Sequence, residues 1–276
     1  LKKNWLFLLL KTAKVNSPAL HNKKIVISAA AEGIGWPIAK SCLSRGAVVY
    51  ISDKNEKALE KISANKLFQK QLFLDAVDVK NPNEVEKYFK RIKEKTNRID
   101  ALINNVGIAG PTATLENIGL NEWKETIDTN LNSHFYFSKY AIPLLKKTDG
   151  GCIINLSSTA GLFGFPLRSP YAASKWAIIG VTKTLAMELG KFNIRVNAIC
   201  PGAVSGERMK KVVEAKAKSL SVSEEQVQKD LESMVSLKKF VGKQDIANMA
   251  IFLLSPESDK ITGQVMTVDG HTERTY

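Results

Sequence analysis

The sequence predicts an α/β fold in which helices cover both faces of a single parallel sheet. Short apolar runs rich in β-branched residues alternate with longer segments whose apolar residues recur at helical spacing. This alternation is typical of parallel sheets, whose strands are buried on both faces. The length of 276 residues and the hydrophobic content of 44% fit one domain with one large core.

Seven short runs dominated by apolar side chains are expected to be strands. In chain order they are Lys24–Ser28, Ala47–Ser52, Gln71–Val77, Ile99–Ile103, Cys152–Leu156, Arg195–Ile199 and Gln264–Val268. The segments with helical spacing are Ile34–Arg45, Glu56–Ala64, Pro82–Glu94, Asn121–Leu145, Tyr171–Leu189 and Gln244–Leu254. Pro37 is compatible with the first helix, because it falls in the opening turn, where a missing N–H costs little.

Two segments stand outside the alternation. Residues 1–20 are expected to form a flexible leader, which leaves 21–276 as the folded domain. The longest apolar run in residues 1–20, Trp5 to Leu10, is six residues long, far shorter than the roughly 18 residues that a membrane span needs.

Residues 204–237 are charged and helix-prone, and they lie between a strand and a helix. Insertions at such places often cover a site, so a lid is expected there.

Composition argues against several classes of function. The net charge is +13, but the surplus is mostly lysine spread over amphipathic stretches, without a dense basic block or interleaved aromatic residues. A solvated surface is therefore favoured over attraction of an anionic substrate or a macromolecular partner, and neither nucleic acid nor membrane is expected to bind. Three cysteines, at 42, 152 and 200, and three histidines show no metal-ligand spacing. We expect no metal and a reducing, cytoplasmic setting.

The turn after the first strand, V-I-S-A-A-A-E-G-I-G at 26–35, has the form of a dinucleotide-binding turn. Such a turn places backbone N–H groups and a helix dipole against a pyrophosphate. Gly33 and Gly35 suit this role, whereas Ala29 stands where a glycine is expected. Alanine is compatible with the turn if its φ is negative.

Asp53 ends the second strand and is a candidate for cofactor selection. A carboxylate there accepts hydrogen bonds from the ribose hydroxyls of an adenosine and repels a 2′-phosphate, which favours NAD(H) over NADP(H). Glu32 adds a second negative charge near the same place. The competing interpretation is that Asp53 only caps a helix starting near Asn55.

A more specific signal is the pair Tyr171 and Lys175 in Y-A-A-S-K. Residues four apart share a helix face, and a nearby cation stabilises phenolate, lowering a tyrosine pKa from about 10 towards the range of an acid/base catalyst. Ser158 follows the apolar run C-I-I-N-L-S-S, at the edge of the sheet where ligands of open α/β folds bind.

Six motifs occur in the order and spacing of the short-chain dehydrogenases/reductases, and the chain resembles this family over about residues 20 to 270. The motifs are S-A-A-A-E-G-I-G, N-N-V-G at 104–107, Asn130 in D-T-N-L-N-S-H-F, Ser158, Y-A-A-S-K and P-G-A-V at 201–204. The resemblance implies a doubly wound, Rossmann-like sheet of seven strands and the NAD-dependent branch of the family.

The resemblance also implies roles for individual residues. Tyr171 would be the acid/base, Lys175 would lower its pKa and hold the nicotinamide ribose, Ser158 would bind the substrate oxygen, and Asn130 would support a water in the proton path. The residues implied to bind the cofactor are Ala29, Gly33, Ile34, Gly35, Asp53, Asp78, Val79, Asn104, Val106, Gly107, Tyr171, Lys175, Pro201, Gly202 and Val204.

This sequence departs from the family pattern in two further places. Val106 replaces the usual alanine and is expected to tighten the wall beside the adenosine. Gly206 stands where a threonine is expected four residues after the Pro-Gly pair, and the role of the neighbouring Ser205 is open.

The expected reaction is hydride transfer between a secondary alcohol and a ketone with NAD(H). Arg168 and Arg208 are candidates for binding an anionic group, so the expected substrate is a small hydroxy acid or a polyol derivative. The competing interpretation of each arginine is a surface side chain paired with an acid. The alternatives are a 3-oxoacyl-carrier-protein reductase using NADPH and a non-enzymatic dinucleotide-binding protein. The resemblance also implies a homotetramer or a dimer, paired through the helices near 121–145 and 171–189.

Overall fold

A computed structural model of the chain describes residues 20–64, 68 and 70–272, without the side chains at 208, 215, 216 and 219. The expected leader falls outside these residues, except for Leu20, which is buried. None of the described helices is long and apolar enough to cross a membrane.

Each of the seven predicted strands is present in the described residues, with bounds that differ by at most two positions. The strands are β1 Lys24–Ser28, β2 Val48–Asp53, β3 Leu72–Ala76, β4 Ala101–Asn104, β5 Gly151–Leu156, β6 Ile194–Pro201 and β7 Val265–Val268. They form one parallel sheet in the order β3-β2-β1-β4-β5-β6-β7. Because the chain runs outward from β1 in one direction and from β4 in the other, the crevice at their carboxyl ends is a ligand position of doubly wound sheets.

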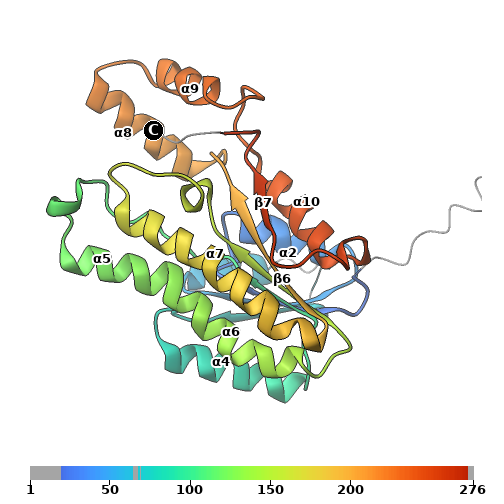
Figure 1. The fold of residues 1–276 in the computed structure, drawn as a ribbon. Coiled ribbons are helices and arrows are strands. Elements are labelled where there is room, and N and C mark those ends of the chain that lie inside the picture. Colours follow the sequence, from blue (N-terminus) through green and yellow to red (C-terminus); the bar gives the residue numbers. More distant parts are fainter. Residues whose placement is uncertain (1–19, 65–67, 69, 273–276) are drawn as a thin grey trace, which may run out of the picture.

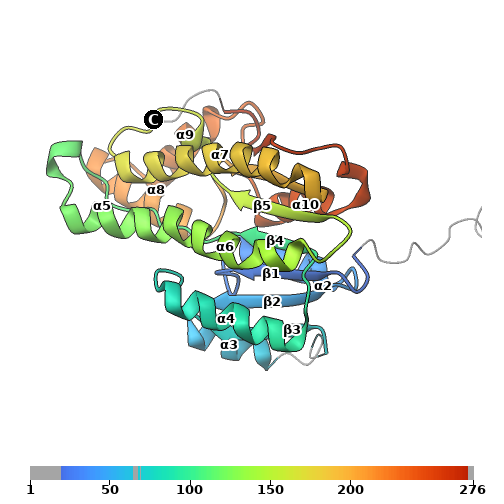
Figure 2. The same ribbon diagram turned by 60° about the horizontal axis from the view of Figure 1, so that its bottom comes forward.

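The helices lie on both faces of this sheet, except for α8 and α9, which lie beyond its carboxyl edge (Figures 1 and 2). They are α2 Gly35–Leu43, α3 Glu56–Ser63, α4 Pro82–Lys95, α5 Leu120–Ile127, α6 Ser133–Leu145, α7 Ser169–Leu189, α8 Glu207–Leu220, α9 Glu224–Ser233 and α10 Lys243–Leu254. One core cluster joins the sheet to α2, α3 and α10, and a second joins it to α4, α6 and α7. Alternate strand residues serve the two clusters: Ile25 and Ile27 face the first, and Val26 faces the second.

The long helix predicted over Asn121–Leu145 is not a single α-helix. α5 and α6 are joined by a π turn, η3, at Asp128–Asn132, and this turn contains the buried Asn130. Apolar spacing cannot reveal a π turn of five residues, because it hardly disturbs the pattern on either side. Such turns occur often at functional sites.

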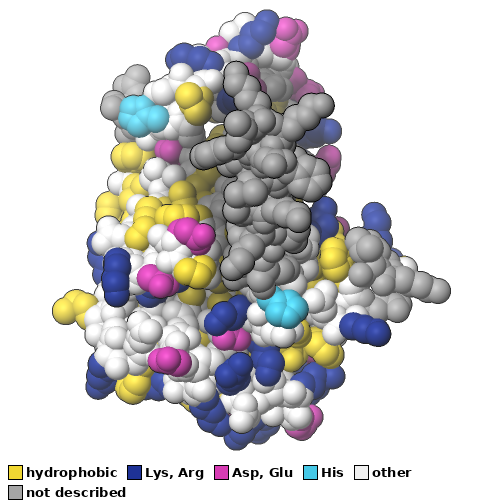
Figure 3. All heavy atoms as spheres, turned by 90° about the vertical axis from the view of Figure 1, so that its right-hand side faces the viewer, with side chains coloured by type: hydrophobic (Ala, Val, Ile, Leu, Met, Phe, Trp, Pro, Cys, Tyr) yellow, Lys and Arg dark blue, Asp and Glu magenta, His cyan; other side chains and the backbone are white. Residues whose placement is uncertain are grey.

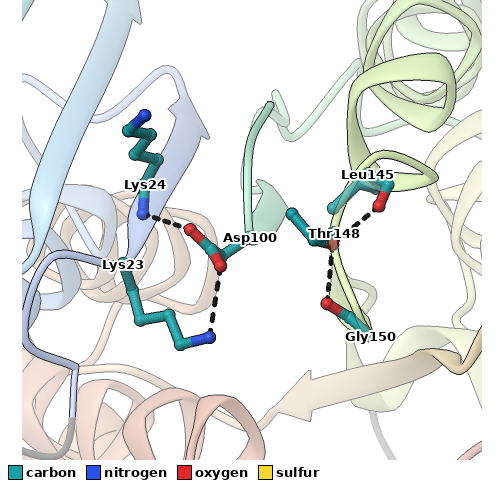
Figure 4. A network of polar contacts seen from close by, with 6 residues as sticks. All are labelled: Lys23, Lys24, Asp100, Leu145, Thr148 and Gly150. Carbon is teal, nitrogen blue, oxygen red and sulfur yellow. Dashed lines mark hydrogen bonds and ion pairs between the residues drawn. The ribbon is translucent and has the colours of Figure 1, made fainter. Parts of the chain in front are cut away.

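The amino edge of the sheet carries a polar network (Figure 4). Asp100, just before β4, accepts hydrogen bonds from the backbone N–H of Lys24 at 2.8 Å and from Lys23 Nζ at 3.2 Å. The hydroxyl of Thr148 lies 2.7 Å from the carbonyl oxygens of both Leu145 and Gly150. These contacts fix the ends of strands at the edge opposite the crevice.

Basic side chains do not gather into a single block on the face shown in Figure 3, where they lie among acidic, hydrophobic and uncharged residues. Four of the six described ion pairs join exposed lysines to exposed carboxylates, on α4, α8, α9 and between Lys80 and Glu125. This dispersed arrangement agrees with the solvated, lysine-rich surface expected from the composition.

Candidate active site

A cleft of about 690 Å³ opens at the carboxyl edge of the sheet. Its walls are the glycine turn, the segments that follow β4, β5 and β6, the start of α7, and the inner sides of α8 and α9. In Figure 1, α8 and α9 lie above this edge, and both belong to the segment 204–237. The predicted site residues in the described walls are Ala29, Gly33, Ile34, Asp53, Gly107, Ser158, Arg168, Tyr171, Lys175, Pro201, Gly202 and Val204.

The glycine turn has the shape that an approaching anion needs. Gly33 adopts a φ of +61°, and a Cβ built there has no neighbour within 4 Å, so its backbone faces open space. Gly35 is buried, and a Cβ there would lie 2.6 Å from Ala30 Cα and 2.7 Å from Asn105 Nδ2. The first turn of α2 contains no acidic residue. The turn therefore fits a pyrophosphate at the helix N-terminus.

Ala29 does not meet the condition set from the sequence, since its φ is +50° rather than negative. The left-handed region costs an L-residue roughly 1–2 kcal/mol. The conformation is held by Asn105, whose Nδ2 donates to the carbonyl oxygens of Ala29 at 2.7 Å and Ser28 at 3.1 Å. The turn thus keeps the backbone shape of a glycine although alanine occupies the position.

Asp53 is not the helix cap. Asn55 caps α3, its Oδ1 accepting from the backbone N–H of Ala58. The Asp53 carboxylate accepts from the backbone N–H groups of Ala31 and Asn55, both at 3.0 Å, and it lines the cleft. Asn55 also donates to the Glu32 carboxylate at 3.1 Å. Two carboxylates are therefore held side by side at this end of the cleft.

Asn104 is not among the described residues that line the cleft, and the next residue, Asn105, lies there instead. Asn104 is buried and donates to Ser138 Oγ and Asn155 Oδ1 inside the protein. Because successive residues of an extended strand point to opposite faces, Asn105 turns towards the glycine turn and lines the cleft. Val106 also lies in the core rather than in the described walls.

Asp78 and Val79 follow β3, the edge strand, and neither is among the described residues that line the cleft. The backbone N–H of Asp78 donates to the Glu84 carboxylate at 2.7 Å, and its own carboxylate accepts from the N–H of Lys80. Val79 is buried in the second core cluster. The strand order explains this position, because β2 separates β3 from the crevice between β1 and β4.

Tyr171 and Lys175 project from one face of α7 into the cleft, as their spacing predicts. Lys175 Nζ lies 5.7 Å from the centre of the Tyr171 ring, and the side chain is only 4% exposed. Its ammonium donates to the carbonyl oxygen of Leu156 at 2.9 Å. A Cβ at Gly107 would come within 3.2 Å of Nζ. The absence of a side chain at Gly107 therefore gives the ammonium its place at the floor of the cleft.

Ser158 lines the cleft together with this pair, and Asn130 is buried nearby. Ser158 Oγ accepts a hydrogen bond from the backbone N–H of Ala160 at 3.2 Å. The Ser158 O–H donates to no acceptor among the described residues. Asn130 lies beneath the walls: its amide accepts from and donates to the backbone of Ile108 at 2.7 and 3.0 Å, and donates to Ser174 Oγ at 3.1 Å. It thereby fixes the start of α7 against the loop after β4.

A histidine that the sequence reasoning did not single out lies beneath this floor. His134 on α6 is buried, and its Nε2 lies 3.3 Å from the Val106 carbonyl oxygen. Burial, with a smaller contribution from the Lys175 charge, lowers the pKa of His134 to about 3. The imidazole is therefore neutral at ordinary pH, and Nε2 carries the proton donated to Val106.

Part of the cleft is apolar. Its described lining includes Phe165 before α7 and residues of the lid: Met209, Val212, Leu231, Met234 and Val235. The Arg168 guanidinium lies 5.7 Å from the Phe165 ring and 5.9 Å from the Tyr171 ring, and it donates to Thr112 Oγ1 at 2.7 Å. Arg208 lies in α8, but its side chain is outside the described part of the structure.

Several lining residues carried no signal in the sequence. Asn105 and Lys243 come together only through the fold, and the apolar residues of α8 and α9 have the spacing of any amphipathic helix. In the described part of the chain, no three His, Cys, Asp or Glu side chains gather into a possible metal site.

Comparisons with known proteins place this arrangement in context. A family model described as enoyl-(acyl carrier protein) reductase matches residues 29–271. The D-beta-hydroxybutyrate dehydrogenase of Rhizobium meliloti (strain 1021) is 30% identical over 254 residues, which cover 90% of this chain and 97% of that protein.

Two solved structures with nearly the same fold carry different cofactors. The NAD⁺-bound xylitol dehydrogenase has a TM-score of 0.86 and 27% identity, covering 91% of this chain and 99% of its own. A variant of actinorhodin polyketide ketoreductase with NADPH has a TM-score of 0.85 and 27% identity, covering 90% and 96%. The fold thus accommodates either nicotinamide dinucleotide, and side chains must select between them.

Proposed function

Because the chain belongs to the short-chain dehydrogenase/reductase family, oxidoreductases that act on hydroxyl and keto groups, we propose that it interconverts a secondary alcohol and a ketone with NAD(H). The observation that carries this proposal is the Tyr171 phenol at the cleft wall with the buried Lys175 ammonium 5.7 Å from its ring. A phenol beside a fixed cation suits an acid/base that must give up and regain a proton.

The bound nicotinamide supplies hydride transfer. The protein residues handle the proton and the oxygen. In the oxidising direction, the Tyr171 phenolate takes the hydroxyl proton of the alcohol and becomes the phenol, and in the reducing direction the phenol donates that proton to the carbonyl oxygen. The Ser158 O–H, which no described acceptor takes, donates to that same substrate oxygen. Lys175 keeps a positive charge at the floor, and Asn130 is proposed to support a water in the proton path.

NAD(H) rather than NADP(H) is supported by the two carboxylates that Asn55 holds together. Asp53 and Glu32 would both face a 2′-phosphate, and neither takes part in an ion pair in the described residues. At an effective dielectric constant of about 20, two unit charges ~5 Å apart repel by roughly 3 kcal/mol. That energy corresponds to on the order of 100-fold in Kd.

The proposed substrate is a small hydroxy acid with an apolar body. Arg168 offers a guanidinium close to the catalytic tyrosine, and a carboxylate bound there would lie near the reacting oxygen. The apolar side chains of Phe165 and the lid disfavour a polyol, whose hydroxyl groups would be left without partners against them. A carboxylate bound by Arg168 and an apolar chain packed against Phe165 and the side chains of α8 and α9 fit these lining residues.

The experiment is a fluorescence titration of the purified protein with NADH and NADPH, followed by a panel of hydroxy acids and neutral alcohols with the preferred cofactor. We expect NADH to bind about 100-fold more tightly than NADPH. Asp53→Ser should narrow this ratio at least tenfold, whereas Asp149→Ser, which removes an exposed carboxylate elsewhere, should leave it unchanged. Preferential binding of NADPH by the wild-type protein would refute the selection of NAD(H).

The same titration tests the alternatives. A 3-oxoacyl-carrier-protein reductase using NADPH would show the opposite cofactor preference, and a non-enzymatic dinucleotide-binding protein would bind NADH without turning over any alcohol. The protein is also proposed to form a homo-oligomer through α6 and α7, where Phe135 and Trp176 are 57% and 51% exposed. Sedimentation of the purified protein measures that state directly.

A further inference from the structure

Gly206 has a neighbour that takes the space of its missing side chain. Its φ is +141°, a conformation that L-residues rarely adopt, so a threonine at this position would be strained. A Cβ built at Gly206 would lie 3.1 Å from Cε and 3.4 Å from Nζ of Lys243. The end of the Lys243 side chain therefore lies where a side chain of residue 206 would begin.

Lys243 projects from backbone that is joined to the wall of the cleft. Val204 and Val241 form a parallel bridge. The N–H of Ser205 donates to the Val241 carbonyl, and the N–H of Val241 donates to the Ala203 carbonyl, both at 2.9 Å. Directly after this bridge, Gly242 caps α10, and Lys243 is the first residue of the helix. The root of its side chain is thus fixed relative to the cleft.

The helix that carries Lys243 packs against α2, which begins at the glycine turn. Gln244, the residue after Lys243, donates to Ser41 of α2 at 3.1 Å. Lys243 lines the same cleft as Gly33 and Ile34, which form the turn at the N-terminus of α2. An anion seated on that turn would therefore lie between two sources of positive potential.

The described carboxylates of the cleft do not pair with Lys243, so its ammonium can contact such an anion. Within the described residues, no ion pair or hydrogen bond involves its ammonium, and the lid carboxylate of Glu207 is paired with Lys210 at 3.5 Å. Of the other described cations in the walls, Arg168 and Lys175 lie beside Tyr171. Asp53 and Glu32 make the opposite end negative.

We propose that Lys243 binds the pyrophosphate of the nicotinamide dinucleotide, in place of a side chain at position 206. This inference rests on the proposed function, since it assumes that the cleft holds such a cofactor. An ammonium offers three donors and a full charge to the diphosphate, where a threonine would offer one neutral hydroxyl. The α2 amides hold the diphosphate from one side and Lys243 holds it from the lid side.

The test is isothermal titration of ADP-ribose, which has the diphosphate but no nicotinamide, with parallel fluorescence titration of NADH. Lys243→Met should raise the Kd of ADP-ribose and the Kd of NADH by about 10- to 100-fold, as expected for loss of a charge-assisted hydrogen bond. It should also reduce the dependence of log Kd on log salt concentration. Lys243→Arg should retain most of the affinity. Lys239→Met removes an exposed charge four residues away and should change each Kd less than twofold.

The outcomes separate this inference from the proposed function. Binding of ADP-ribose by Lys243→Met with the wild-type affinity and salt dependence would overturn the role of Lys243 and leave the proposed function intact. If the wild-type protein binds neither ADP-ribose nor NADH, both proposals fail. If Lys239→Met weakens binding as much as Lys243→Met does, the role of Lys243 is also overturned, because the effect then reflects net charge alone. Thermal unfolding of each variant establishes that the fold is retained.

Discussion

His134 is expected to make the stability of the protein sensitive to acid. The side chain is buried beneath the floor of the cleft, and burial together with the Lys175 charge lowers its pKa to about 3. In the unfolded chain, a histidine has a pKa of about 6.5. Above that value the imidazole is neutral in both states, and its contribution to stability is fully present.

As the pH falls below about 6.5, His134 binds a proton in the unfolded chain but not in the folded protein, so the folded state loses stability. The loss is roughly 1.4 kcal/mol per pH unit and continues until the folded pKa near 3 is reached. Between pH 7.5 and pH 5, His134 should therefore reduce the free energy of unfolding by about 2 kcal/mol.

The assay is urea unfolding of wild-type protein and His134→Gln at pH 7.5 and pH 5. Glutamine can donate to the Val106 carbonyl but does not titrate, so the variant should lose about 2 kcal/mol less than the wild type over this interval. His21→Gln, which changes an exposed histidine, should behave as the wild type. An equal loss in wild type and His134→Gln would show that His134 is not held neutral in the folded protein.

Three further predictions concern the site. Tyr171→Phe should lower kcat by about 10²- to 10⁴-fold while the Kd of NADH changes little, and a comparable loss of cofactor binding would contradict its role as acid/base. Ala29→Gly should raise the free energy of unfolding by roughly 0.5–1 kcal/mol, because relief of the left-handed alanine exceeds the added flexibility of the unfolded chain; a lower midpoint in urea would count against strain there. Arg168→Ala should raise KM for a hydroxy acid about tenfold but not KM for the matching neutral alcohol, and unchanged turnover of the acid would exclude an anion contact.

Most of the fold followed from spacing and composition, because buried strands and amphipathic helices leave strong periodic signals. The pair Tyr171 and Lys175 was also predictable, since four positions along a helix fix a common face. The π turn at Asp128–Asn132 was not, because it alters hydrogen bonding without changing which residues are apolar. Spacing alone gives helix faces but not local helix type.

The errors at single residues have local causes. Asn104 and Asn105 are identical in type, and only the exact end of β4 decides which of them faces the cleft. Ala29 keeps a left-handed φ because Asn105 holds its carbonyl, a long-range contact across 76 positions of sequence. Lys243 lies 37 positions from Gly206, and the bridge between Val204 and Val241 brings their segments together.

The two lid helices have a small core of their own. Val213, Ala217 and Val227 are buried against one another, with Met209 and Leu231 packed beside them. Since α8 and α9 hold each other in this way, residues 207–233 form a unit whose inner side lines the cleft, while the sheet and α7 carry the proposed reacting groups. Under the proposed function, exchange of this unit between relatives would change alcohol specificity and leave the hydride chemistry in place.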